Sequence, residues 1–212
     1  MAVKTTPVEA QRVDPPTGPL LSLCLVVASS LLLGGLTSLA QGFLPEALSS
    51  FANSASGWTI LSALILWFIR GRTALSALLG GIGFVGLVVG YTVVSQMRGI
   101  YYSPVLFGVI GLVVGPFVGV AASWLHSRGW RAASAVALLS GIGIGEMNHG
   151  LTVVGDTTHP LYWILVGVVG AALLVVVVVR RLDAPMVRIS AVAATAAVAC
   201  AFVYAYSLLG SA

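Results

Sequence analysis

The sequence predicts an all-α membrane protein, a polytopic bundle of seven transmembrane helices, with six as the alternative. Hydrophobic residues fill 58% of the 212 positions, charged residues fill only 8%, and the mean hydropathy is +1.05. Soluble domains carry charge on roughly a quarter of their residues. Apolar runs of about 20 residues, the length that crosses a bilayer, recur along the whole chain. Most of the surface must therefore face lipid.

These apolar runs predict the individual helices in order. The spans are expected at residues 19–39, 51–69, 73–95, 104–125, 131–149, 160–179 and 187–209. The second and fifth are the least apolar, because the second begins with Asn53 and Ser54 and the fifth ends with Glu146 and Asn148. Together they form one transmembrane domain, residues 19–210, preceded by a flexible cytoplasmic tail at residues 1–18.

The basic residues predict the orientation. If the N-terminus lies in the cytoplasm, nine of the ten Lys and Arg residues fall on the cytoplasmic side, and Arg98 alone falls outside. Basic connections stay in the cytoplasm in membrane proteins. Removing one helix would scramble this pattern, so seven spans are favoured, with the C-terminus outside. The expected location is the inner (plasma) membrane.

The first apolar run has a second interpretation. Lys4 and Arg12 precede it, and Ser38-Leu39-Ala40 ends it, as in a cleavable signal peptide. The run is about 20 residues long, however, whereas the core of a signal peptide has about 7–15. We therefore expect an uncleaved first helix.

Small residues at helical spacing predict where the helices touch. Lipid gives helices no hydrophobic reason to associate, so close backbone contact at Gly, Ala and Ser is what holds them together. Four such series are Ser30/Gly34/Ser38, Gly86/Gly90, Gly111/Gly115/Gly119 and Ala193/Ala197/Ala201/Ala205. We expect them on contact faces inside the bundle, with a homo-oligomer as a further option. Cys24 and Cys200 are expected to be buried in packing.

Several classes of function are disfavoured. No charged residue lies near the middle of any predicted span, where ion-coupled carriers commonly place one. The net charge of +4 is too small and too dispersed for a nucleic-acid binder. No metalloprotease motif, phosphate-binding loop or nucleophile–base pair is present. An enzyme is the least supported class.

Residues suited to binding gather instead on the predicted outer face. Residues 41–50 predict a short amphipathic helix on the membrane surface, a lid over a cavity or a shield for helix ends. The next outer loop holds Arg98, Tyr101 and Tyr102. The third holds Glu146, His149, Asp156 and His159, with Glu146 and His149 on one helix face at a spacing of three. These last four residues are candidate ligands for a divalent metal. The plain alternative is a solvated loop in which Glu146 only caps a helix or pairs with Arg98.

Two segments carry a family resemblance. Gln41-Gly-Phe-Leu-Pro-Glu46 and Phe51-Ala-Asn-Ser-Ala-Ser-Gly-Trp58 resemble a stretch found in small bacterial polytopic membrane proteins of unknown function. The resemblance implies a membrane location. It implies no activity, so it assigns no role to Asn53 or Trp58.

Three hypotheses of function follow. The first is binding or transport of a small solute at an outward-facing site made of Asn53, Trp58, Arg98, Tyr101, Tyr102, Glu146, His149 and His159. The second is a structural or assembly subunit of a membrane complex, whose partners are the bilayer and another protein. The third, a metal-dependent enzyme, depends only on the Glu/His loop.

Overall fold

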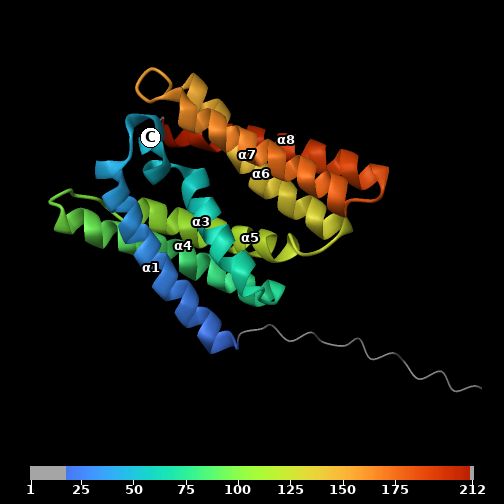
Figure 1. Ribbon diagram of the computed structural model, residues 1–212, viewed down its shortest axis with the longest axis horizontal. Helices are drawn as coiled ribbons and strands as arrows, with labels where there is room; N and C mark the ends of the chain where they lie inside the picture. Colours follow the sequence, from blue (N-terminus) through green and yellow to red (C-terminus); the bar gives the residue numbers. More distant parts are fainter. Residues whose placement is uncertain (1–17, 211–212) are drawn as a thin grey trace, which may run out of the picture.

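The computed structural model of the protein describes residues 18–210, and these residues form helices joined by short connections (Figure 1). The helices are α1 (Pro19–Phe43), α2 (Glu46–Ser49), the 3-10 helix η1 (Ser50–Asn53), α3 (Ala55–Ile69), α4 (Thr73–Met97), α5 (Val105–Trp124), α6 (Gly129–Thr152), α7 (Pro160–Arg181) and α8 (Pro185–Gly210). The all-α prediction is confirmed, and no strand occurs between residues 18 and 210. The tail predicted at residues 1–18, with Lys4 and Arg12, lies almost wholly outside the described residues.

Five of these helices are long and apolar enough to cross a membrane, namely α1, α4, α5, α7 and the Pro185–Leu208 part of α8. A sixth candidate is a broken span, in which α2 and η1 meet α3 at an angle of 66°. Helix α6 is as long as its neighbours, with 24 residues, but less apolar. Much of its surface is small residues buried against other helices rather than side chains facing lipid. The chain therefore has the architecture of a multi-pass membrane protein.

The long helices pack in two groups (Figure 1). In the first group α4 lies between α1 and α5, and α3 packs on α5 and α4. In the second group α6 lies between α7 and α8. The two groups meet where α5 and α3 contact α6. As a result α6 touches both groups and lies at the centre of the molecule.

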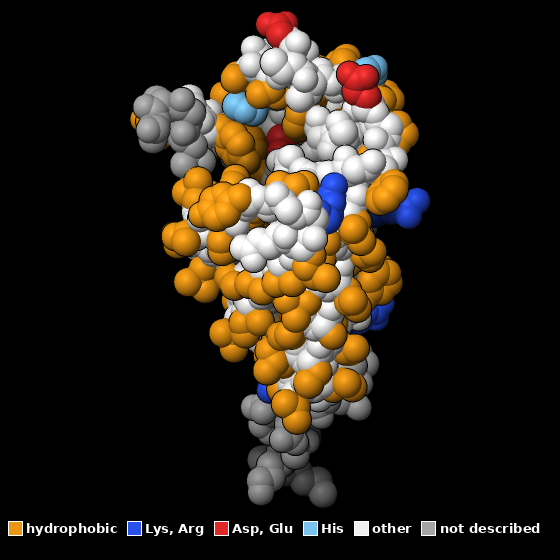
Figure 2. Space-filling view, turned by 90° about the vertical axis from the view of Figure 1, so that its left-hand side faces the viewer, with side chains coloured by type: hydrophobic (Ala, Val, Ile, Leu, Met, Phe, Trp, Pro, Cys, Tyr) orange, Lys and Arg blue, Asp and Glu red, His pale blue; other side chains and the backbone are white. Residues whose placement is uncertain are grey.

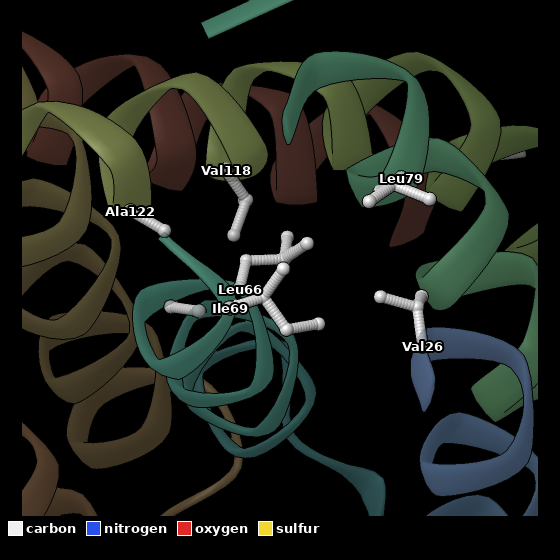
Figure 3. Packing of buried hydrophobic residues seen from close by; sticks show 7 residues of the cluster. Val26, Leu66, Ile69, Leu79, Val118 and Ala122 are labelled. Carbon is white, nitrogen blue, oxygen red and sulfur yellow. The ribbon is translucent and has the colours of Figure 1, made fainter. Parts of the chain in front are cut away.

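Each group has its own apolar core. In the first, Val26 of α1, Leu66 of α3, Leu79 of α4 and Val118 of α5 point toward one another (Figure 3). In the second, α6 contributes alanines and Val136, which pack on α7 and on the start of α8.

Glycine allows the closest contacts inside the first group. A Cβ added at Gly119 would collide with the backbone carbonyl of Ser76, and one at Gly34 with that of Leu87. The backbones of α4 and α5, and of α1 and α4, therefore run in direct contact. The prediction that the Ser30, Gly86 and Gly111 series lie on contact faces is confirmed.

For α8, the prediction of a contact face inside the bundle was wrong, whereas the homo-oligomer option stays a prediction. Its ridge of Ala193, Ala197, Ala201 and Ala205 is exposed on the outside of the molecule. The helix packs instead through Thr195, Val198, Ala199 and Phe202 against Gly141 and Gly145 of α6. Because α8 is rich in small residues on several sides, its own spacing could not indicate which side meets α6. Cys24 and Cys200, expected to be buried, are exposed as well.

The second predicted span was also wrong in its first turn. The helix does not begin at residue 51, because Ser54 has an extended backbone (φ −99°, ψ 142°) and acts as the N-cap of α3. The amphipathic helix expected at residues 41–50 is reduced to the single turn of α2, since α1 continues to Phe43. The chain is therefore kinked at Ser54.

Candidate functional site

A polar cavity of about 450 Å³ opens at the end of the bundle where α2, η1 and the α6–α7 connection meet. Figure 2 faces this end, and polar and charged side chains gather around its upper part, with hydrophobic side chains below. Segments far apart in the sequence form its wall. The cavity is lined by Gln41, Ser49, Ser50, Asn53, Glu146, His149, Val154, Thr157, Thr158, Trp163 and Tyr206.

Glu146 is the only charged side chain among these lining residues, and it is only 3% exposed. Its two carboxylate oxygens accept the backbone N–H groups of Ala55 at 2.6 Å and Ser56 at 2.7 Å. These are the first two N–H groups of α3, which have no partner inside their own helix. The positive end of the helix dipole also favours a negative charge at this place. Glu146 on α6 therefore caps α3.

Ser54 completes the cap. Its hydroxyl accepts the N–H of Gly57 at 2.7 Å, the third N–H of α3. The same hydroxyl is hydrogen-bonded to the hydroxyl of Tyr162 on α7, which is buried. The break before α3 is thus stabilised by α6 and α7, both from the other helix group.

The opposite wall is organised by a buried tyrosine. The Tyr91 hydroxyl donates to Oε1 of Gln41 at 2.7 Å, and Oδ1 of Asn53 lies 3.3 Å from it. Trp58 packs on Tyr91 with ring centroids 5.5 Å apart, and its Nε1 donates to the carbonyl of Ala52 at 3.0 Å. Tyr91 has one hydroxyl hydrogen, so the shorter contact makes the Gln41 oxygen its acceptor and leaves the Gln41 amide nitrogen free to donate into the cavity.

Aromatic rings form the rest of the wall. The His149 ring lies 4.9 Å from the ring of Tyr206 on α8, which stacks on Phe202 at 4.5 Å. Nε1 of Trp163 donates to the hydroxyl of Thr158 at 2.9 Å, tying α7 to the α6–α7 connection. A molecule in the cavity would meet aromatic side chains, amides and hydroxyls.

Three of the eight predicted binding residues, Asn53, Glu146 and His149, line this cavity. Glu146 and His149 are three residues apart and lie on the same side of α6, as expected. Trp58 does not line the cavity, because its ring packs against Phe84 and Tyr91 of α4. His159 is exposed and caps α7, where its Nδ1 accepts the N–H of Leu161 at 3.2 Å.

The residues predicted in the second outer loop lie elsewhere. Arg98 donates to the backbone carbonyl of Ser38 on α1, not to Glu146. Tyr101 is 87% exposed. Tyr102 packs edge-on against Tyr91 at 4.7 Å, and burial raises the pKa of its hydroxyl to about 12. These three residues follow α4, whose end lies beside α1 rather than α6, and so they are outside the cavity wall.

The four predicted metal ligands do not come together. Within residues 18–210, no group of three or more His, Cys, Asp or Glu side chains is placed to hold a metal ion. Glu146 and His149 share the cavity, whereas Asp156 is on the exposed connection and His159 caps α7. Each oxygen of Glu146 accepts one N–H of α3. The structure therefore places two of the four residues, Glu146 and His149, in the wall of one polar cavity.

Sequence reasoning did not single out most of the wall. Thr157 and Thr158 follow Asp156 in the predicted outer loop, and they line the cavity whereas Asp156 does not. Gln41 lies in the segment predicted as a lid. Tyr206 carries no local signal, because only the contact between α6 and α8 brings it to His149.

The family model of a "Family of unknown function (DUF6518)" matches residues 13–211, which is nearly the whole chain. The chain belongs to this family. No curated protein and no solved structure matches it. The resemblance to an uncharacterised membrane family is confirmed, and any assignment of activity depends on the site itself.

Proposed function

We propose that this protein binds a small neutral or cationic polar solute in the polar cavity at the N-terminus of α3. The solute enters this cavity from the extracytoplasmic side of the membrane. The observation that carries the proposal is the cavity itself. Its volume is about 450 Å³. Hydroxyls, amides and aromatic rings line it together with the buried carboxylate of Glu146, which caps α3. Pockets of this size with a few convergent polar groups are typical binding sites for small molecules.

The proposed orientation follows from the arginines. Arg70, Arg72, Arg128, Arg131, Arg180, Arg181 and Arg188 are at the α3–α4, α5–α6 and α7–α8 connections, at the end of the bundle opposite the cavity. With these connections in the cytoplasm, the chain crosses the membrane seven times, counting α6 and the broken α3 span. The cavity then opens outward.

The charge of the wall supports the proposed solute class. The described lining residues include one carboxylate and one histidine but neither Lys nor Arg. An anion would meet Glu146 without a compensating cation, whereas an amine could donate to the remaining lone pairs of the carboxylate.

A solute panel sorted by charge tests the proposal. Purified protein is heated in mild detergent with small amines, polyols, zwitterions and carboxylates. We expect members of the first two groups to raise the melting temperature, and carboxylates to leave it unchanged. A hit is then measured by calorimetry. If no compound in the panel binds, or if carboxylates bind best, the proposed solute class is wrong.

A matched pair of variants ties binding to this cavity. Thr157 lines the cavity and Thr152 does not, although both are exposed and both hydroxyls bond to a backbone carbonyl. We expect Thr157→Trp to weaken binding of the hit at least tenfold by filling the cavity, and Thr152→Trp to leave it unchanged. Equal binding to both variants would remove the site assignment.

A further inference from the structure

A second hollow lies along the boundary between the two helix groups. This α3–α7 groove has a volume of about 430 Å³, and its walls are α3 and α7, which both pack on α6. Ala63 and Trp67 of α3, Ile142 of α6, and Val169, Leu173 and Val176 of α7 line it. Apart from Ser56, Thr59 and one arginine, the described lining residues are apolar or glycine.

The groove runs along the bundle axis and opens sideways. Its lining on α7 extends from Val166 to Arg181, which is about 22 Å at the helical rise of 1.5 Å per residue. One leaflet has about half of the 30 Å hydrocarbon thickness. Val169 and Val176 are each about half exposed, at 54% and 48%, so the edge of the groove faces the surroundings of the bundle. A long hydrocarbon chain matches this shape.

One end of the groove carries a positioned positive charge. Nη1 of Arg181 donates to the carbonyl of His126 at 3.1 Å and lies 3.5 Å from that of Ser127. A guanidinium has five N–H donors, so Nε and Nη2 remain for another acceptor. The backbone contacts hold the group in place, and its planar fork suits a phosphate.

The surroundings of Arg181 are also basic. Arg180 and Arg128 are at the same end, and the acidic neighbour Asp183 pairs with Arg128 at 3.8 Å. The Trp67 ring, which lines the groove, stacks on His126 at 5.1 Å and closes the wall beside Arg181. Basic pockets between transmembrane helices bind the headgroups of anionic lipids.

We propose that the α3–α7 groove binds an anionic phospholipid, with one acyl chain along the apolar wall and the phosphate on Arg181. The charge at one end and the apolar length together select this occupant. A soluble apolar ligand would leave Arg181 without an anion, and a free phosphate would leave the apolar wall uncovered. The proposal does not depend on the solute cavity at the other end.

Lipid retention in native mass spectrometry tests the headgroup contact. Delipidated protein is titrated with phosphatidylglycerol or phosphatidylcholine of identical chains, for the wild type, Arg181→Gln and Arg180→Gln. We expect the wild type to prefer phosphatidylglycerol, Arg181→Gln to lose about tenfold in affinity for it, and Arg180→Gln to retain most of it. Arg180 is the adjacent control, because it is exposed and does not line the groove. Equal loss in both variants would mean diffuse attraction and would overturn the proposal.

A second pair tests the acyl chain. Val176 lines the groove and Val175 does not, and both are exposed, so neither Val→Trp change needs to disturb the fold. We expect Val176→Trp to weaken retention of both lipids several-fold and Val175→Trp to have no effect. If Val176→Trp binds phosphatidylglycerol like the wild type, or if glycerol phosphate without chains competes equally well, the groove is not the binding site.

Discussion

The side chain of Glu146 closes the N-terminus of a helix that is distant in sequence. Helices usually satisfy their first N–H groups with a nearby Ser, Thr, Asp or Asn. Here Ser54 supplies one acceptor, and Glu146, 91 residues beyond Ala55, supplies the other two. A carboxylate in such a position is both a structural clamp and the floor of the polar cavity. Its burial next to lipid-facing helices is tolerable because both oxygens are satisfied.

Replacing Glu146 should destabilise the protein through α3. Glu146→Ala leaves two buried N–H groups without partners, and we expect a loss of roughly 2–4 kcal/mol, since hydrogen bonds to charged groups contribute about 1.5–3 kcal/mol. Glu146→Gln keeps one acceptor and should lose less. Denaturant unfolding in detergent micelles measures both.

The control for this prediction is Glu46→Ala, which removes an exposed acidic side chain from the first turn of α2. Surface changes of this kind usually alter stability by no more than about 0.5 kcal/mol. If Glu146→Ala is no more destabilising than Glu46→Ala, the cap has no energetic importance.

At the scale of elements, α3 is too short to span a membrane by itself. Its 15 residues extend about 22 Å, against the roughly 30 Å of hydrocarbon. Only together with α2 and η1, which turn away by 66°, is it a candidate span. Broken helices leave a helix N-terminus below the membrane surface, an arrangement that transporters use at binding sites. In this protein the same break creates the polar cavity.

The contact between α4 and α5 depends on the absence of side chains. A Cβ at Gly119 would collide with the carbonyl of Ser76, whereas one at Gly108 would meet nothing within 4 Å. Overpacking a close contact costs about 1–3 kcal/mol. We therefore expect Gly119→Ala to lower the melting temperature by several degrees.

Gly108→Ala is the matched control, because Ala favours a helix over Gly by up to about 1 kcal/mol. It should leave the melting temperature unchanged or raise it slightly. Equal melting temperatures for the two variants would contradict the direct backbone contact between α4 and α5.

The whole molecule is asymmetric along its long axis. One end holds the polar cavity and the connections with Glu46 and Asp156, and the other holds seven arginines. Between them, α6 joins the two helix groups and contributes both to the cavity, through Glu146 and His149, and to the α3–α7 groove, through Ile142. A molecule bound at either place contacts both helix groups.

Thiol labelling in intact cells tests the orientation. After Cys24 and Cys200 are replaced by alanine, single cysteines are introduced at Ser103, Asp156 and Arg72, which are all exposed. We expect a membrane-impermeant reagent to label positions 103 and 156 and to reach position 72 only after lysis. The reverse pattern would invert the topology, and labelling of position 103 without 156 would mean an odd number of crossings between them, instead of the two expected for α5 and α6.

The sequence by itself determined the fold class, the approximate position of nearly every helix and the one-sided distribution of arginine. Helix α4 begins at Thr73 and α7 at Pro160, as predicted. The length of an apolar run and the position of a proline fix helix boundaries without any contact to distant residues. Only the tertiary structure decided that Ser54 breaks a helix, that Glu146 caps it, that α8 turns its alanine ridge outward and that Tyr206 reaches the cavity. Each of these depends on which helix lies beside which, and in a chain of similar apolar helices that choice is made by contacts between residues far apart in the sequence.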